Sequence, residues 1–309
     1  MPNRPQVTVL GSLNMDISVT VPRLPEPGAT VLGSAARFTP GGKGANQAVA
    51  AARLGGSVRM AGCVGDDDFG RQLLAALRAE KVDTAGVRVT AGAPTGLAMI
   101  SVDQAGENII TVAPGANHQV GRAEVYAALA EPNHVLVASA EIPVTALVAA
   151  LARHRVSILN LAPAPAAAAE VVAGARPDWL VVNETEAAAI LGRPVSGLAE
   201  AAMAAQALLN AGTKHAVVTA GAHGAALADG PGPAATVRAF RVDAVDTVGA
   251  GDTFVGALAV TLAAGVPAAD AVRAAAAAGA TAATRPGAQA GMPSPEDIRA
   301  VTGLIWPIR

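Results

Sequence analysis

The clearest chemistry in the chain lies in a glycine-rich turn followed by an acid, namely Gly249, Ala250, Gly251 and Asp252. These residues lead into a predicted helix over Asp252–Ala263. The free N–H groups and positive dipole end of a helix N-terminus bind anions such as a phosphate group. A carboxylate beside such an anion site can accept the proton of an attacking hydroxyl, which makes these four residues catalytic candidates. The alternative for Asp252 is a helix N-cap, a position that aspartate favours.

Two further stretches follow predicted strands and carry groups that could contact a nucleotide. Asn183 and Glu186 come directly after the predicted strand Trp179–Val182. Their spacing is that of a helix capping box, and the same side chains could instead lie near phosphates and magnesium. A second motif, TAGAHG at 219–224, follows the predicted strand His215–Thr219. Its glycines permit close backbone approach to a ligand at the carboxyl end of a strand, and a plain tight turn fits equally well.

Polar groups near the N-terminus suit a neutral polyhydroxy ligand. Asn14 and Asp16 follow the predicted strand Gln6–Leu10. In an extended chain they point to the same side, where an amide and a carboxylate could pair with adjacent hydroxyl groups. Lys43 and Asn46 open a predicted helix within GGKGANQ at 41–47, which is not a P-loop because the GxxxxGK[ST] spacing is absent. The alternatives are that Asp16 is a turn residue and that Asn46 faces solvent.

Predicted strands and helices alternate regularly from about residue 122. This alternation indicates βαβ units, and therefore a three-layer α/β sandwich in which helices cover both faces of a mostly parallel sheet. The predicted strands are Gln6–Leu10, His134–Ala138, Val156–Asn160, Trp179–Val182 and His215–Thr219. The predicted helices are Lys43–Leu54, Phe69–Glu80, Arg122–Ala130, Val144–Arg153, Glu184–Leu191, Leu198–Ala211 and Asp252–Ala263. We expect alanine-rich helices in the rest of the chain.

Two segments, Ile17–Phe38 and Thr95–Val112, break this alternation. Their short β-branched runs are separated by proline, glycine and asparagine and show no helical period. We expect them to form a small β-sheet outside the main one, approximately over 15–38 and 95–112. No repeat, linker or charge run divides the sequence, which predicts a single domain over 1–309.

Composition argues against several classes of protein. A formal net charge of −2 and 2% aromatic residues argue against nucleic acid as a partner. The longest apolar runs, Val255–Val266 and Ala274–Ala283, are too short or too rich in alanine and glycine to predict a membrane span. Cys63 is the only cysteine, which excludes an intramolecular disulfide and a cysteine-based metal site. With no apolar signal segment at the N-terminus, the sequence predicts a cytoplasmic protein.

Taken in order, the motifs resemble those of the ribokinase-like (phosphofructokinase-B) carbohydrate kinases over nearly the whole chain. GGKGAN and GAGD at their separation are very specific to this family, and GSxNxD and PGAN point within it to members that phosphorylate ribose. The matching motifs are GSLNMD at 11–16, GGKGANQA at 41–48, GDDDFG at 65–70, TGLA at 95–98, PGAN at 114–117, NLAPA at 160–164, NETE at 183–186, TAGAHG at 219–224, DTVGAGDTF at 246–254 and TRPGAQ at 284–289.

The resemblance implies an ATP-dependent kinase that phosphorylates the 5-hydroxyl of D-ribose and dimerises through a β-sheet lid. The implied sugar contacts are Asn14, Asp16, Gly42, Lys43, Asn46 and Glu141, with Asp252 as the base. The implied ATP contacts are Asn183, Thr219, Gly221, Ala222, His223, Gly224 and Gly251, with Ala276 beside the adenine and Glu186 in the network around Mg²⁺. The implied K⁺ site is formed, mostly through backbone carbonyls, by Asp246, Val248, Ala282, Arg285, Gly287 and Gly291.

Two positions depart from the family pattern, and several alternatives stay open. Gly291 stands where relatives often have serine, which bears on K⁺ affinity, and Ala276 stands where some have a polar residue beside the adenine. Fructose, deoxyribose or a nucleoside such as adenosine are alternative acceptors, although the lid offers few rings besides Phe38 to stack a base. A non-catalytic sugar-binding protein on the same fold is a further alternative, against which the intact Gly249–Asp252 motif argues. A dinucleotide-dependent dehydrogenase is excluded because the first strand lacks the GxGxxG turn.

Overall fold

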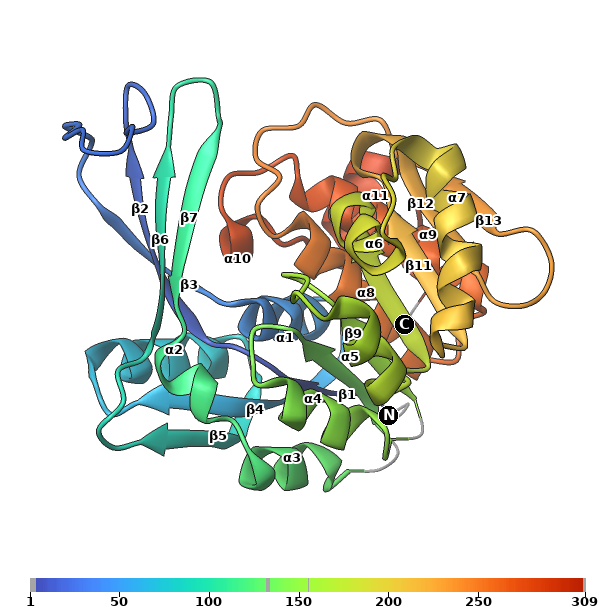
Figure 1. The fold of residues 1–309 in the computed structure, drawn as a ribbon, viewed down its shortest axis with the longest axis horizontal. Helices are drawn as coiled ribbons and strands as arrows, with labels where there is room; N and C mark the ends of the chain where they lie inside the picture. Colours follow the sequence, from blue (N-terminus) through green and yellow to red (C-terminus); the bar gives the residue numbers. More distant parts are fainter. Residues whose placement is uncertain (1–3, 132–133, 155, 308–309) are drawn as a thin grey trace.

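The main sheet organises the computed structural model, which describes residues 4–131, 134–154 and 156–307 (Figure 1). Along the sheet, the strands of this described part are β13 (Ala235–Arg238), β12 (Gly224–Ala228), β11 (His215–Thr219), β10 (Trp179–Asn183), β9 (Ser157–Asn160), β8 (Val135–Ser139), β1 (Gln6–Leu10), β4 (Ser57–Gly65) and β5 (Asp83–Thr90). Neighbouring strands from β11 to β5 run parallel, whereas β12 and β13 are antiparallel to their neighbours. The mostly parallel sheet predicted from the sequence is therefore confirmed.

Helices cover both faces of this sheet, because side chains along each strand alternate between two buried layers. In β1, Val7 and Val9 belong to one hydrophobic cluster and Leu10 belongs to the other. The first cluster includes residues of α1 (Lys43–Arg53), α2 (Asp68–Ala79), α8 (Ala250–Ala263), α9 (Ala268–Ala282) and α11 (Pro295–Thr302). The second includes residues of α3 (Arg122–Leu129), α4 (Val144–Leu151), α5 (Ala168–Ala175), α6 (Glu184–Leu191) and α7 (Gly197–Leu208). The three layers follow directly from this division.

A second sheet stands apart from the main one, and we call its strands the lid. They are β3 (Arg37–Gly41), β2 (Asn14–Thr20), β6 (Gly96–Val102) and β7 (Asn108–Ala113), in that order across the sheet. Figure 1 shows β2, β6 and β7 projecting together from the body of the molecule. This is the small sheet that the sequence predicted outside the main one. One part of the prediction was wrong, because residues 21–36, which are rich in proline and glycine, form no strand.

The hairpin of β12 and β13 also differs from the sequence prediction, which expected alanine-rich helices there. Every residue of β12 is buried, and its small side chains enter both hydrophobic clusters: Ala225 and Leu227 on one face, Ala226 and Ala228 on the other. Alanine favours helices in isolation, but a strand that is covered on both faces gains more from burial than it loses in propensity. Tertiary packing therefore decides the structure of this segment.

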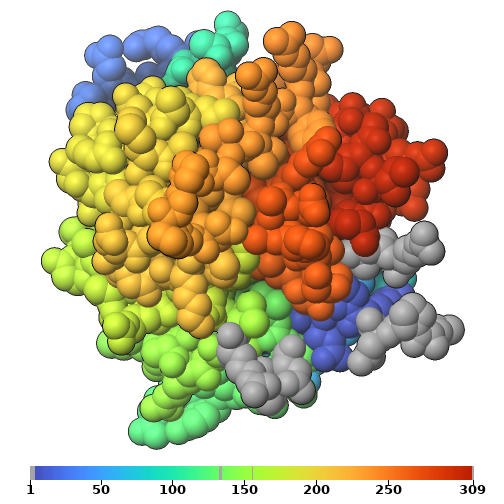
Figure 2. Space-filling model, turned by 90° about the vertical axis from the view of Figure 1, so that its right-hand side faces the viewer, coloured from blue at the N-terminus to red at the C-terminus, as the bar shows by residue number. Residues whose placement is uncertain are grey.

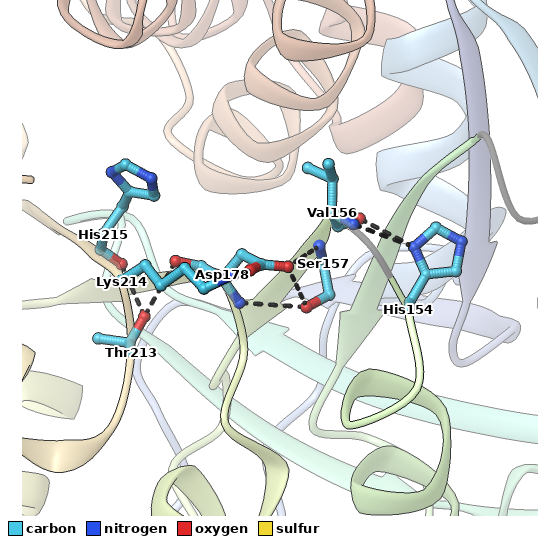
Figure 3. Close-up of polar contacts among 7 residues, drawn as sticks. All are labelled: His154, Val156, Ser157, Asp178, Thr213, Lys214 and His215. Atoms are coloured by element: carbon cyan, nitrogen blue, oxygen red, sulfur yellow. Dashed lines mark hydrogen bonds and ion pairs between the residues drawn. The ribbon is translucent and has the colours of Figure 1, made fainter.

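A polar cluster joins the amino ends of β9, β10 and β11 (Figure 3). Asp178 Oδ2 accepts hydrogen bonds from the N–H and the hydroxyl of Ser157, at 2.9 and 3.1 Å. Asp178 Oδ1 pairs with Lys214 Nζ at 2.6 Å, and Thr213 Oγ1 donates to the backbone oxygens of Asp178 and His215. Because these groups satisfy one another's hydrogen bonds, we infer that the cluster holds β9, β10 and β11 in alignment.

The face away from the lid is built largely from the C-terminal half of the chain. Figure 2 shows yellow to red segments over most of this face, with the lid visible only at its far edge. Within the part of the chain that the structure describes, no helix combines the length and the apolar character needed to cross a membrane.

Candidate active site

The motifs expected to bind the nucleotide (the nucleotide-side residues) and those expected to bind the sugar (the sugar-side residues) meet at the carboxyl ends of the central strands. A cavity of about 210 Å³ opens there, bordered by residues from the first turns of α1, α6 and α8. The candidate residues that line it are Lys43, Asn183, Glu186, Thr219, Gly249, Gly251 and Asp252. Its other lining residues are Asn160, Ala162, Val181, Val182, Thr247 and Val255. Parallel strands present their carboxyl ends at one edge of a sheet, so motifs far apart in the sequence share one cavity.

Asp252 lies in the first turn of α8 and is held by two amide groups. The helix begins at Ala250 with Gly249 as its N-cap, so Asp252 is the third helical residue, and the N-cap alternative is wrong. Asp252 Oδ2 accepts a hydrogen bond from Asn46 Nδ2 at 2.9 Å, and Asp252 Oδ1 accepts one from Gln47 Nε2 at 3.1 Å. Each carboxylate oxygen keeps a lone pair for a further proton. The arrangement can therefore serve a general base that is fixed in position.

The turn before α8 exposes backbone N–H groups. Gly249 has a φ of +78°, and a Cβ at this position would lie 2.9 Å from Ala288 Cα, so only glycine fits here. Within the described residues, the N–H groups of Gly251 and Asp252 have no acceptor. Free N–H groups at the positive end of a helix dipole bind negative charge. The anion site and the carboxylate of Asp252 are thus within one helical turn.

The first turn of α1 gathers the sugar-side residues. Gly42 has a φ of +88°, and a Cβ there would lie 2.7 Å from the backbone nitrogen of Asn14, so this glycine allows β2 to begin against the helix. Glu141, which follows β8, reaches the same point. Its Oε2 accepts hydrogen bonds from the N–H of Lys43 at 3.2 Å and from Ser12 Oγ at 2.5 Å. The segment before β2 and the start of α1 thereby meet the residue that follows β8.

Asn117 sets the orientation of the Asn14 side chain. Asn117 Nδ2 donates to Asn14 Oδ1 at 2.7 Å, and Asn117 Oδ1 accepts from the N–H of Leu13 at 2.9 Å. Both asparagines are buried. Since the Asn14 oxygen is engaged, its amino group is the end left to donate to a ligand.

Carboxylates outnumber cations around Lys43, which lines the cavity. Burial raises the pKa of Asp16 to about 7, and the charges of Glu141 and Asp252 add to this effect. Burial also raises the pKa of Glu186. Lys43 lies among these groups: its burial lowers its pKa, but the surrounding carboxylates outweigh this and hold the pKa above its ordinary value. One lysine among four carboxylates leaves an excess of negative charge, which suits a ligand that brings cations.

The capping-box and ligand-binding interpretations of the NETE motif are compatible. Asn183 Oδ1 accepts from the N–H of Glu186 at 2.8 Å, and Glu186 Oε2 accepts from the N–H of Asn183 at 2.9 Å. Both side chains nevertheless line the cavity, as does Thr219 at the end of β11. Other nucleotide-side candidates do not line it, namely Gly221, Ala222, His223, Gly224 and Ala276. The first three form an exposed 3₁₀ turn directly after β11.

Asp246 ties two loops together beside the anion-binding turn. Its Oδ1 accepts from the N–H of Val248 at 3.0 Å, and its Oδ2 accepts from the N–H of Gly287 at 2.8 Å. The segment before α8 and the segment after α9 are therefore held as one unit.

The backbone carbonyls of Ala282, the last residue of α9, and of Arg285 converge beside Gly291. A Cβ on Gly291 would lie 3.1 Å from the carbonyl oxygen of Arg285 and 3.2 Å from that of Ala282. In the residues that the structure describes, no group of three or more His, Cys, Asp or Glu side chains could hold a metal ion. A cation at this loop would therefore depend on carbonyl oxygens.

Comparison with known proteins identifies the family. Residues 4–295 match the model of the pfkB family carbohydrate kinases. A ribokinase of Schizosaccharomyces pombe is 39% identical over 303 residues, which cover 93% of this chain and 95% of that protein. The chain belongs to the pfkB family of carbohydrate kinases.

Two further relatives illustrate the range of this likeness. The structure of Arabidopsis thaliana ribokinase complexed with ribose and ATP has a TM-score of 0.84 and 28% identity, covering 98% of this chain and 100% of that one. A deoxyribokinase of Salmonella typhi is 33% identical over 82% of this chain and 84% of that protein. The family resemblance and the fold inferred from the motifs are both confirmed.

Several polar residues of the site were not among the sequence candidates. They are Ser12, Gln47, Asn117, Asn160 and Gln289, which bond to candidate residues or to one another. Each one lies inside a motif that matched the family pattern, next to residues that already had a role. Their partners lie far away in the sequence, so the motif alone does not tell which side chain meets which.

Proposed function

We propose that this protein transfers the γ-phosphoryl group of ATP to the 5-hydroxyl of D-ribose, which yields D-ribose 5-phosphate and ADP. The observation that carries the proposal is the buried carboxylate of Asp252 beside the N–H groups of Gly251 and Asp252, which have no acceptor among the described residues. A base and an anion site within one helical turn suit phosphoryl transfer to a hydroxyl. Family membership supports a carbohydrate acceptor, and the ribokinase relatives favour ribose.

The sugar would be held by the sugar-side residues in roles that match their chemistry. Carboxylates accept hydrogen bonds from hydroxyl groups, and the amino groups of Asn14 and Lys43 donate to hydroxyl oxygens. The proposed contacts are Asn14, Asp16, Gly42, Lys43, Asn46 and Glu141. Alternating donors and acceptors of this kind recognise a chain of neighbouring hydroxyl groups.

In the proposed reaction, Asp252 accepts the proton of the 5-hydroxyl as its oxygen attacks the γ-phosphorus. The bond between this phosphorus and the bridging oxygen breaks, and ADP leaves with that oxygen. The backbone of the Gly249–Gly251 turn, including Ala250, stabilises the negative charge of the transferring group. Asn46 and Gln47 fix the carboxylate, so little reorganisation is needed at the moment of transfer.

ATP would bind on the other side of the cavity, with Mg²⁺ between its phosphates and the protein. The proposed nucleotide contacts are Asn183, Glu186, Thr219, Gly221, Ala222, His223, Gly224, Gly251 and Ala276. Mg²⁺ commonly keeps several waters and uses one or two carboxylates together with phosphate oxygens. Glu186 is a buried carboxylate on the cavity wall, and the excess of negative charge there fits a divalent cation.

We further propose a K⁺ site formed by Asp246, Val248, Ala282, Arg285, Gly287 and Gly291. The convergence of the Ala282 and Arg285 carbonyls supports it, because K⁺ prefers oxygen ligands. An ion there would act through the Gly249 turn, since Asp246 joins both loops.

We propose that residues 1–309 form a single kinase domain and that two copies of the chain form a homodimer through the lid. Its outer strand β7 is exposed along its whole length, and Phe38, Met99, Ile109 and Ile110 are large exposed apolar residues of the lid. An exposed apolar sheet of this kind marks a protein interface.

The substrate is tested by ADP production from ATP with purified protein and a panel of D-ribose, 2-deoxyribose, fructose, adenosine and uridine. We expect the highest kcat/KM for ribose, with a 5-phosphate product in the ³¹P spectrum. The deoxyribokinase relative makes 2-deoxyribose the second candidate. A higher kcat/KM for any other acceptor would overturn the choice of ribose, and no turnover with any sugar would favour a binding protein.

A further inference from the structure

A short helix, α10 (Ala288–Gly291), contacts both the Gly249 turn and Asn46, one of the two residues that hold Asp252. Ala288 packs against Gly249, where the added Cβ of any other residue would lie 2.9 Å from Ala288 Cα. Gln289 Nε2 donates a hydrogen bond to Asn46 Oδ1 at 3.1 Å, and Asn46 Nδ2 donates to Asp252 Oδ2. The position of α10 therefore bears on the anion-binding turn and on the base together.

Arg53 also binds α10, through backbone oxygens. Its Nη1 donates to the carbonyl oxygens of Gln289 and Met292, at 2.6 and 2.9 Å. Its remaining donors Nε and Nη2 bind both carboxylate oxygens of Glu80, at 3.0 and 2.6 Å, which fixes the guanidinium plane. Arg53 is the last residue of α1 and Asn46 lies in the first turn of the same helix. The hydrogen bonds from Arg53 to Gln289 and from Gln289 to Asn46 therefore form a closed circuit with α1.

The direction of the hydrogen bonds in this circuit is determined by Asp252. An ionised carboxylate only accepts, so Asn46 must turn its amino group to Asp252 and its oxygen to Gln289. Gln289 must then donate through Nε2. With the Asn46 amide rotated by 180°, two oxygens would face each other at Asp252 and two amino groups would face each other at Gln289. Gln289 thus adds a second anchor to the orientation of Asn46 that Asp252 imposes.

We propose that Gln289 is a positioning residue for phosphoryl transfer, acting on Asp252 through Asn46, with Arg53 holding α10 in place. The proposal rests on the proposed role of Asp252 as the base. Through Gln289 and Asn46, the loop after α9 is linked by hydrogen bonds to the Asp252 carboxylate, in addition to its contact with Gly249. Asn46 is buried, so without Gln289 its oxygen would lack a partner and its amide would lose one of two anchors.

The test is a double-mutant cycle of Gln289→Ala and Asn46→Ala, with kcat and both KM values measured. We expect Gln289→Ala alone to lower kcat about tenfold, equivalent to about 1.4 kcal/mol, with little change in the KM for ATP. In the Asn46→Ala background we expect Gln289→Ala to cause no further loss of kcat, because Asn46 no longer links Gln289 to Asp252. Gln289→Glu, which removes the donor and keeps the size, should lower kcat at least as much.

A matched control separates positioning from loss of structure. Ala290→Ser alters an exposed neighbour in the same short helix and should retain wild-type kcat and melting temperature. Wild-type kcat in Gln289→Ala, or losses that multiply in the double variant, would overturn the proposal.

A second measurement does not depend on the acceptor. Hydrogen exchange of the Asn46 side-chain amino group, followed by NMR, should be faster in Gln289→Ala than in wild type. Unchanged exchange would overturn the proposal whatever the substrate proves to be, whereas inactivity of the wild type with ribose would overturn only the proposed function.

Discussion

Asp252 shows how a single carboxylate can be buried and still remain available for a proton. Its two amide donors come from neighbouring residues of α1, Asn46 and Gln47, and each engages a different oxygen. Gln47 is completely buried and donates also to Asn160 Oδ1 at 3.0 Å, so its amide cannot turn freely. The carboxylate is therefore oriented by groups that cannot take up its proton. Lys43 is the neighbouring cation that offsets its charge, because Asp252 raises the pKa of Lys43.

We predict that Asp252→Asn lowers kcat by about 10²–10⁴-fold and retains ATP binding. Asparagine has nearly the same shape but cannot accept the hydroxyl proton. Steady-state kinetics and calorimetric titration with ATP measure the two effects. Exposed Asp243→Asn, which makes the same change in charge, should keep wild-type kcat. Wild-type kcat in Asp252→Asn would remove this residue from the reaction.

We predict that Asp16→Asn stabilises the ligand-free protein at pH 8 by several degrees in melting temperature, and much less at pH 4.5. Burial, Glu141 and Asp252 raise the folded-state pKa of Asp16 to about 7, above its ordinary value of 3.8. Between these values the folded protein binds more protons than the unfolded chain, so the contribution of Asp16 to stability falls as pH rises from about 4 to 7. Removing the charge removes this loss.

Thermal unfolding at several pH values measures the effect of Asp16→Asn. A pH-independent shift in melting temperature would contradict the raised pKa of Asp16. The same variant should raise the KM for ribose, because an amide replaces a carboxylate acceptor at the sugar.

At the scale of elements, local pattern predicts the strands and helices that carry the site better than it predicts their contacts. Strands β10 and β11 are short apolar runs that end where polar motifs begin, so their existence and ligand-facing ends follow from the sequence. The start of α8 does not follow from the sequence, because Gly249, in the left-handed conformation, lets the helix begin two residues before Asp252. The bond between Gln47 and Asp252 joins residues 205 positions apart, and only the tertiary fold brings them together.

The loop after α9 carries a prediction on cation activation. We expect activity to rise with KCl at fixed ionic strength, against a choline chloride background and with K⁺-free enzyme. Gly291→Ala should raise the K⁺ concentration for half-activation, because its methyl group would enter the space on which the Ala282 and Arg285 carbonyls converge and would offer no ligand. Ala290→Ser is the matched control. A flat response to K⁺ in wild type would show that the loop needs no ion.

At the scale of the whole molecule, the site depends on both sheets. The main sheet supplies Asn160, Asn183 and Thr219 at strand ends, while Asn14 and Asp16 are carried by the lid. The register places Asp16 opposite Thr39 and Ala98 within the lid, so the position of the lid decides where the proposed sugar contacts lie. Whatever fixes the lid, such as the proposed second subunit, would therefore also act on the proposed sugar contacts.

We predict that the lid forms the contact of a homodimer and that charges on its outer strand dissociate it. Ile110 pairs with Ile100 and Ile109 pairs with Ser101, so the two isoleucines lie on opposite faces of the lid. The double substitution Ile109→Asp with Ile110→Asp thus places a charge on each face, and light scattering should report a monomer in place of a dimer. Met203→Asp, at a residue of α7 that is 57% exposed, is the control and should remain dimeric. A dimer that survives the lid substitutions, or a monomeric wild type, would contradict the lid as the dimer contact.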